Sequence, residues 1–78
     1  MTRAEKKAQD RAIQARVAVR VFAEMAAKRA VIAAIRADGL RVHDFANRTI
    51  SMMAHEWLEA HPELYAQARQ RAAELGYC

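Results

Sequence analysis

The 78-residue chain has one cysteine, one proline, two glycines and few aromatic residues. Because Cys78 has no partner in the chain, a fold held together by internal disulfides is excluded, and we expect a reducing, cytoplasmic setting. Sparse glycine also means that no glycine-rich phosphate loop is present. The longest uncharged apolar run, residues 30–35, is too short to cross a bilayer, and the N-terminus lacks an apolar segment. We therefore expect neither a membrane span nor a secretion signal.

Alanine and helix-favouring polar residues dominate what is present. Hydrophobic residues make up 54% of the chain, but 19 of these 42 residues are alanine, which contributes helix propensity more than buried area. Few β-branched runs occur between the many Ala, Arg, Glu and Gln residues. The composition predicts an all-α fold with a small core.

Three helices are predicted from the few helix breakers. The first runs from about Thr2 to a glycine cap at Asp38-Gly39, and the second starts between Val42 and Asn47, with Asp44 or Asn47 as N-cap. His61-Pro62-Glu63-Leu64 predicts a cap and first turn for the third, which ends at Leu75-Gly76. We expect a three-helix arrangement in which one long N-terminal helix is packed by two shorter helices. This single domain over 1–78 divides into a basic arm free to project (1–16), the core part of the first helix (17–37), a second helix (42–60) and a third helix (62–75).

The second and third helices are too short to cover the whole length of the first helix. The first helix is about 50 Å long, and the other two reach only about 20 to 27 Å each. Residues 17–35 carry only a narrow charged stripe, which predicts that this half is enclosed. The predicted packed faces are Val42, Ala46, Ile50, Met53, Trp57 and Ala60 on the second helix, with Leu58 outside that face, and Leu64, Ala68, Ala72 and Leu75 on the third.

A smooth, alanine-rich side of the first helix gives a second reason to expect association. Small residues let another helix approach closely, which predicts self-association or a partner groove. The candidate self-association residues are Val19, Phe22, Ala26 and Ala33. The alternative is that the three-helix core uses this side as well.

Charge is distributed asymmetrically along the chain. Residues 1–36 hold nine Lys/Arg against three Asp/Glu, whereas residues 37–78 hold four against six. A basic helix attracts an acidic protein surface or nucleic acid, although a solvated Arg-rich helix is the plain alternative. The candidate partner-binding residues are Arg3, Lys6, Lys7, Arg11, Arg16 and Arg20.

Catalytic and metal signals are weak. His55-Glu56-Trp57-Leu58-Glu59 begins like a zincin helix, but Glu59 stands where the second histidine is required. His55 and Glu59 would bind a metal only if His43 or His61 supplied a third ligand. Ser51 lacks a hydrolase elbow, and Cys78 sits at the chain terminus. We therefore expect a non-enzymatic protein without catalytic, cofactor-binding or metal-binding residues.

A helix-turn-helix is the alternative function, because Gly39 aligns with the turn glycine of that motif and Leu40 and Phe45 fall at apolar positions. Ile35 and Arg48 do not fit the motif, so a DNA-binding transcriptional regulator is the second hypothesis.

The segment from Gly39 to Phe45, followed by a helix and His61-Pro62-Glu63-Leu64, resembles a layout of small helical proteins in bacterial and phage genomes. The resemblance covers about half the chain and assigns no site residue. It suggests a phage or mobile-element accessory protein that binds host or viral machinery. We expect a small helical binding module of this kind, which can also form a homodimer.

Overall fold

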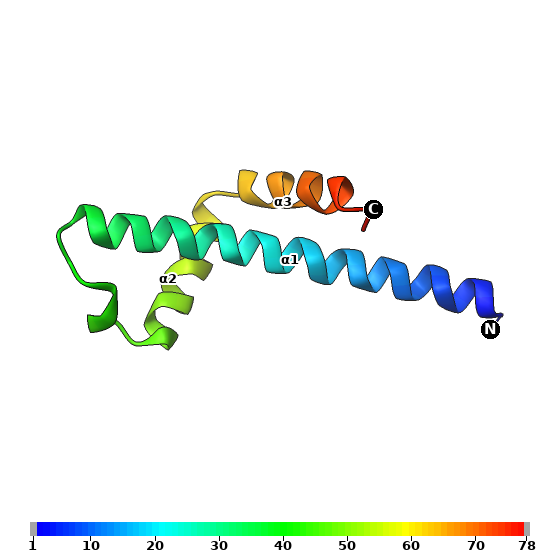
Figure 1. Ribbon diagram of the computed structural model, residues 1–78, viewed down its shortest axis with the longest axis horizontal. Helices are drawn as coiled ribbons and strands as arrows, with labels where there is room; N and C mark the ends of the chain where they lie inside the picture. The colour runs from blue at the N-terminus through cyan, green and yellow to red at the C-terminus, as the bar shows by residue number, and fades with distance from the viewer. Residues whose placement is uncertain (1, 78) are drawn as a thin grey trace.

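The computed structural model describes residues 2–77, which form an all-α, three-helix fold without a strand (Figure 1). Helix α1 (Arg3–Ala37) is followed by a short 3-10 turn, η1 (Val42–Asp44), and then by α2 (Asn47–Ala60) and α3 (Glu63–Glu74). Helix α2 crosses the C-terminal half of α1, and α3 runs back along the middle of α1 in the opposite direction (Figure 1). The predicted fold class, one long helix packed by two shorter ones, is confirmed.

Helix α1 spans the whole molecule. The structure measures 55 × 21 × 19 Å, and a helix of 35 residues is about 52 Å long. Both short helices pack against α1, whereas α2 and α3 scarcely contact each other. The core therefore depends on α1 as a common support. Within the described part of the chain, no helix combines the length and apolarity needed to span a membrane.

The N-terminus of α1 is fixed by a capping box. The backbone N–H of Glu5 donates to Oγ1 of Thr2 at 3.2 Å, and the backbone N–H of Thr2 donates to Oε2 of Glu5 at 3.3 Å. These bonds satisfy two amides that a helix start would otherwise leave without partners. Helix α1 is therefore regular from Arg3 onward and includes the whole basic N-terminal segment.

Glycines in the left-handed region end both α1 and α3. At Gly39 (φ 76°), the N–H of Leu40 donates to the carbonyl of Ile35 at 3.1 Å, as in a Schellman motif. The same motif at Gly76 (φ 85°) turns Tyr77 back toward α1. The predicted helix ends at Asp38-Gly39 and Leu75-Gly76 are confirmed to within one residue.

The predicted N-caps of α2 and α3 need correction, whereas the first residue of α2, Asn47, lies at the end of the predicted range of 42–47. The N-cap of α2 is Ala46, whereas Asp44 ends the preceding 3-10 turn and Asn47 is the first helical residue. Neither expected side-chain cap forms, because the turn separates Asp44 from the helix and Asn47 lies inside the helix. The N-cap of α3 is Pro62 rather than His61.

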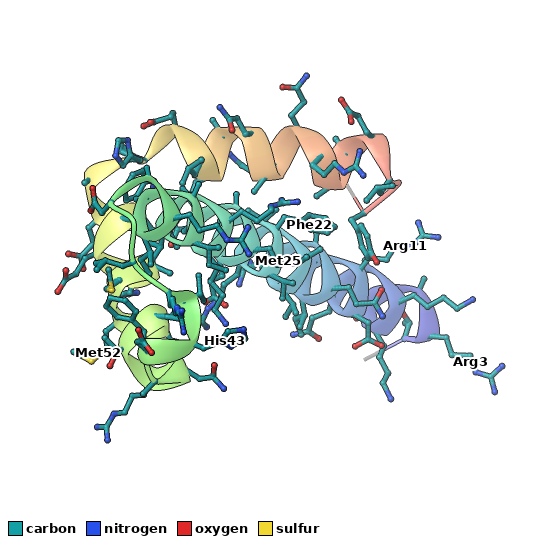
Figure 2. All side chains as sticks on the ribbon, turned by 60° about the vertical axis from the view of Figure 1, so that its left-hand side comes forward. Arg3, Arg11, Phe22, Met25, His43 and Met52 are labelled. Atoms are coloured by element: carbon teal, nitrogen blue, oxygen red, sulfur yellow. The ribbon has the colours of Figure 1, made fainter. Side chains whose placement is uncertain are left out.

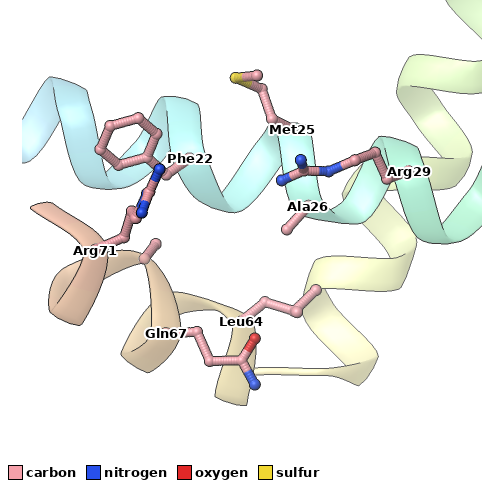
Figure 3. Close-up of a pocket in the computed structure, with 8 residues that line it drawn as sticks. Phe22, Met25, Ala26, Arg29, Leu64, Gln67 and Arg71 are labelled. Atoms are coloured by element: carbon pink, nitrogen blue, oxygen red, sulfur yellow. The ribbon is translucent and has the colours of Figure 1, made fainter.

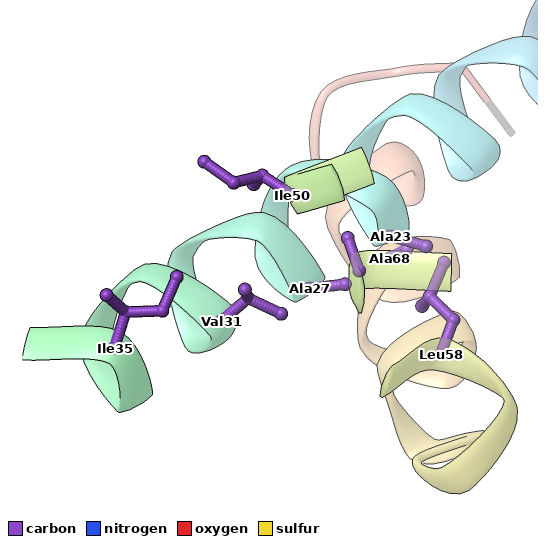
Figure 4. Close-up of a cluster of buried hydrophobic side chains, with 8 residues drawn as sticks. Ala23, Ala27, Val31, Ile35, Ile50, Leu58 and Ala68 are labelled. Carbon is purple, nitrogen blue, oxygen red and sulfur yellow. The ribbon is translucent and has the colours of Figure 1, made fainter. Parts of the chain in front are cut away.

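The core is small and rich in alanine (Figure 4). Its buried residues are Ala18, Ala23, Ala27, Val31, Ile35, Ile50, Ala54, Leu58, Ala68 and Ala72. Six of these ten are alanine, so the helices approach closely and bury little area per residue. Four larger side chains supply most of the hydrophobic stabilisation: Val31, Ile35, Ile50 and Leu58.

The packed face of α2 is rotated relative to the prediction. Ile50, Ala54 and Leu58 form the buried row, and Leu58, which was expected outside the face, is only 3% exposed. Trp57 is half-buried at the edge of the core, where its ring stacks on His61 with a centroid distance of 4.7 Å. The predicted row and the buried row share Ile50 and diverge after it, and the predicted residues Val42, Met53 and Trp57 pack partly buried against the core.

The other predicted faces are confirmed only in part. On α3, Ala68 and Ala72 are buried, but Leu75 is 52% exposed because it caps the helix. On α1, Val17, Val21 and Met25 were expected to be enclosed and are exposed. The side of α1 that faces neither α2 nor α3 therefore carries a row of exposed apolar residues.

Candidate binding surface

The N-terminal part of α1 lies outside the three-helix core. Every residue from Thr2 to Gln14 is exposed, and this end of α1 extends past the end of α3 (Figure 1). We use the name basic arm for residues 3–16, which hold five Lys/Arg and two Asp/Glu. The arm is a regular helix that carries a formal charge of +3, and all its residues except the half-buried Ala15 are exposed.

The six predicted partner-binding residues are all exposed, and Arg3 and Arg11 extend outward in Figure 2. Nε of Arg20 lies 3.2 Å from Oε1 of Glu24, in a pair exposed to solvent. Within residues 2–77, the other five form no ion pair: Arg3, Lys6, Lys7, Arg11 and Arg16. Their charge is therefore available to a partner.

Periodicity groups three of these side chains. Arg3, Lys7 and Arg11 follow one another at four-residue intervals, so they lie on one face of the helix along about 12 Å. A rigid row of cations on an extended helix presents a regular pattern to an anionic surface.

An apolar stripe begins near the C-terminal end of the arm and continues along α1. We use this name for Ile13, Val17, Val21 and Met25, which recur every four residues and are 51%, 55%, 43% and 50% exposed. Sequence reasoning placed Val17, Val21 and Met25 in the enclosed half of the first helix and Ile13 in the projecting arm. Their four-residue spacing was visible in the sequence, but their exposure follows from where α2 and α3 lie.

A shallow groove of about 550 Å³ lies along the N-terminal part of the stripe. Ile13, Val17 and Val21 line it, together with Tyr77 from the C-terminal turn. The ring of Tyr77 meets Phe22 edge to face, with centroids 6.3 Å apart and planes at 70°. Sequence reasoning did not identify Tyr77, because its position depends on the Gly76 turn.

The predicted self-association residues lie on a different side of α1. Val19 and Phe22 are half-buried and pack against the core, and Ala26 is half-buried, whereas Ala33 is exposed. Thus α3 already occupies part of the smooth side, as the alternative interpretation proposed. Association through these residues remains a prediction.

A second groove, of about 420 Å³, lies between α1 and α3. Phe22, Met25 and Arg29 line it from α1, and Arg71 of α3 points toward the Phe22 ring (Figure 3). Nη1 of Arg71 is 3.9 Å from a carboxylate oxygen of Glu74, a long contact between exposed groups. Because Met25 belongs to both this groove and the apolar stripe, two guanidinium groups flank the C-terminal end of the stripe.

The histidines pair with single carboxylates. Nε2 of His55 is 3.4 Å from Oε1 of Glu59, and Nδ1 of His61 is 3.0 Å from Oε1 of Glu63. The pKa of Glu63 lies below its usual range, because its backbone N–H and then the His61 side chain stabilise the carboxylate. Across residues 2–77, no group of three or more metal-ligating side chains comes together. Cys78 lies outside the described residues.

The connection between α1 and α2 bears on the helix-turn-helix alternative. It comprises nine residues, Asp38 to Ala46, and includes the 3-10 turn. Helix-turn-helix motifs use turns of three to four residues. No observation in the structure therefore favours α2 as a DNA-recognition helix, and the alternative remains a prediction.

Comparison with protein-family models, curated proteins and solved structures finds no match to this chain. The candidate site is therefore defined by its own geometry: a basic arm that continues into an exposed apolar stripe.

Proposed function

We propose that the chain is a small cytoplasmic binding module that recognises an anionic macromolecule through the basic arm of α1. The observation that supports this proposal is the arm itself, a capped helix whose five Lys/Arg side chains are exposed beyond the core. A helical segment whose side chains are almost all exposed contributes little to packing in the monomer. Its charge raises the local concentration of an anionic partner and speeds encounter.

Recognition through the arm depends on charge rather than on sequence reading. Lys and Arg rows bind phosphates or carboxylates, whereas specific DNA readout requires a set of side chains that reach the base edges. The arm has no aromatic side chain, and its only amide side chains are those of Gln9 and Gln14. An acidic protein surface and a nucleic acid backbone both meet its requirement.

Fluorescence anisotropy at low salt tests this proposal with two labelled probes, a short DNA duplex and poly-glutamate. We expect weak binding of the parent to both. The triple variant Lys6→Gln, Lys7→Gln and Arg11→Gln should lose most of it, because glutamine preserves helix propensity and removes charge.

The matched control is Arg41→Gln, Arg48→Gln and Arg69→Gln, which removes the same formal charge from exposed positions outside the arm. This control should retain most of the binding. Equal losses in the two triple variants would assign binding to the net charge of the chain, and a parent that binds neither probe would refute the proposal.

A further inference from the structure

We propose that the apolar stripe is a docking site for an amphipathic helix of a partner protein whose flanks carry Asp and Glu. This inference deepens the proposed function, because it rests on an anionic partner and names its chemistry. The stripe is a second feature of α1 that overlaps the end of the arm at Ile13 and differs from the arm in its chemistry. Its four side chains are each about half exposed and lie outside the core cluster.

The shape of the stripe suits a helix. Its four residues at four-residue spacing extend about 18 Å and form a ridge of the kind that packs into the grooves of a second helix. The groove beside Tyr77 provides a recess for an apolar side chain at one end of this ridge. Helix recognition generally uses anchor residues at such three- and four-residue intervals.

Charges on both flanks select an acidic partner. Arg16, Arg20 and Lys28 follow stripe residues at three-residue spacing on one side. Arg29 and Arg71 lie beside Met25 on the side of α3. The nearby carboxylates, Glu24 and Glu74, face Arg20 and Arg71 respectively, in exposed pairs that contribute little stability and can exchange partners. The rim of the stripe is therefore positively charged.

Two other occupants of the stripe, a second copy of this chain and nucleic acid, fit it less well. A second copy of this chain would bring like charges from Arg16, Arg20 and Lys28 against their counterparts, which opposes association. Nucleic acid gains nothing from aliphatic side chains, since its strands bind to cations and to aromatic platforms. An acidic amphipathic helix satisfies both the apolar stripe and its basic rim.

A synthetic peptide probe tests this proposal by fluorescence anisotropy. The peptide carries leucines at four-residue spacing flanked by glutamates, and its isomer has the same composition with the leucines spread around the helix. The parent should bind the first peptide at least about tenfold more tightly than the isomer. Equal affinities, or no binding of the first peptide, would overturn the proposal.

Variants of the protein locate the site. Val17→Ser with Val21→Ser should weaken peptide binding about tenfold or more, because both side chains are exposed and serine has a similar helix propensity. The control, Leu40→Ser with Met52→Ser, changes two equally exposed apolar residues elsewhere and should bind as the parent does. Unchanged binding by the stripe variant would place the peptide elsewhere and refute the site.

Two further measurements separate this inference from the proposed function and from self-association. The stripe variant should bind the DNA duplex like the parent, so loss of peptide binding alone leaves the function of the arm standing. Sedimentation equilibrium should show no parent dimer that depends on the stripe at the concentrations of the assay. A dimer that Val17→Ser with Val21→Ser dissociates would replace the acidic helix with a second copy of the chain and overturn the inference.

Discussion

Phe22 in the middle of α1 and Tyr77 after α3 meet edge to face, with ring centroids 6.3 Å apart. This contact lies near the N-terminal limit of the core, because α3 ends here and α1 continues alone toward Arg3 beyond the buried Ala18 (Figure 1). The glycine turn at Gly76 directs Tyr77 onto Phe22. The turn and the aromatic pair together determine how much of α1 stays uncovered.

Tyr77→Ala should lower the free energy of unfolding by about 1 kcal/mol, since an aromatic pair contributes about 0.5 to 1.5 kcal/mol beyond its buried area. Urea denaturation followed by circular dichroism measures the change. Tyr65→Ala is the control, because Tyr65 lies on α3 and forms no aromatic pair within residues 2–77. Equal costs for the two variants would show that the pair adds nothing specific.

Leu58→Ala should destabilise the fold by about 2 to 5 kcal/mol, because Leu58 is 3% exposed and is one of four large buried side chains. Met52→Ala, on the exposed side of the same helix, should change stability by less than about 0.5 kcal/mol. Thermal melts of both variants provide the comparison. A parent-like melt for Leu58→Ala would contradict the assigned packing of α2.

In the alanine-rich interface, adding side-chain volume should also destabilise the fold. Ala27→Leu should cost about 1 to 3 kcal/mol or more, because Ala27 is fully buried where the helices approach closely. Ala33→Leu places the same side chain at an exposed position of α1 and should be nearly neutral. Denaturant midpoints measure both effects, and a stabilised Ala27→Leu variant would reveal unfilled space at this position.

Glu63 predicts a small dependence of stability on pH. Its folded pKa is lowered by its own backbone N–H and by His61, so the native state binds the proton less readily than the unfolded chain. The stabilisation is present at neutral pH and is lost as the pH falls through the folded pKa of Glu63.

Glu63→Gln should therefore melt at a lower temperature than the parent near neutral pH, with the difference disappearing in acid. The effect should be small, because the carboxylate is exposed. Thermal melts recorded at a series of pH values test this expectation. The expectation fails if the difference in melting temperature between parent and variant grows as the pH falls.

Local signals in the sequence predicted much of this fold, and contacts between helices account for what they missed. The ends of α1 and α3 were predictable because a glycine with positive φ acts within one helical turn. Thr2 and Glu5 also had the spacing of a capping box, a signal that was present but unused. The buried face of α2 was not fixed by its period, since rows through Trp57 and through Leu58 both continue from Ile50 at helical spacing, and packing against α1 selects between them.

The candidate site divides in the same way. Exposure of the basic arm could be predicted, because Lys and Arg without apolar neighbours do not enter a core. The apolar stripe could not, since Val17 and Met25 have the residue types and spacing of a core row. Only the position of α3 and of Tyr77 shows that no described element covers this side of α1.

The salt dependence of DNA binding tests the central claim, that the basic arm binds anions by charge. Each phosphate neutralised should steepen the slope of log affinity against log salt by about 0.9 on duplex DNA. The parent should therefore give a steep slope, Lys6→Gln, Lys7→Gln and Arg11→Gln a clearly shallower one, and Arg41→Gln, Arg48→Gln and Arg69→Gln a slope like that of the parent. The claim is contradicted if the parent shows no binding at low salt, or if all three proteins give the same slope.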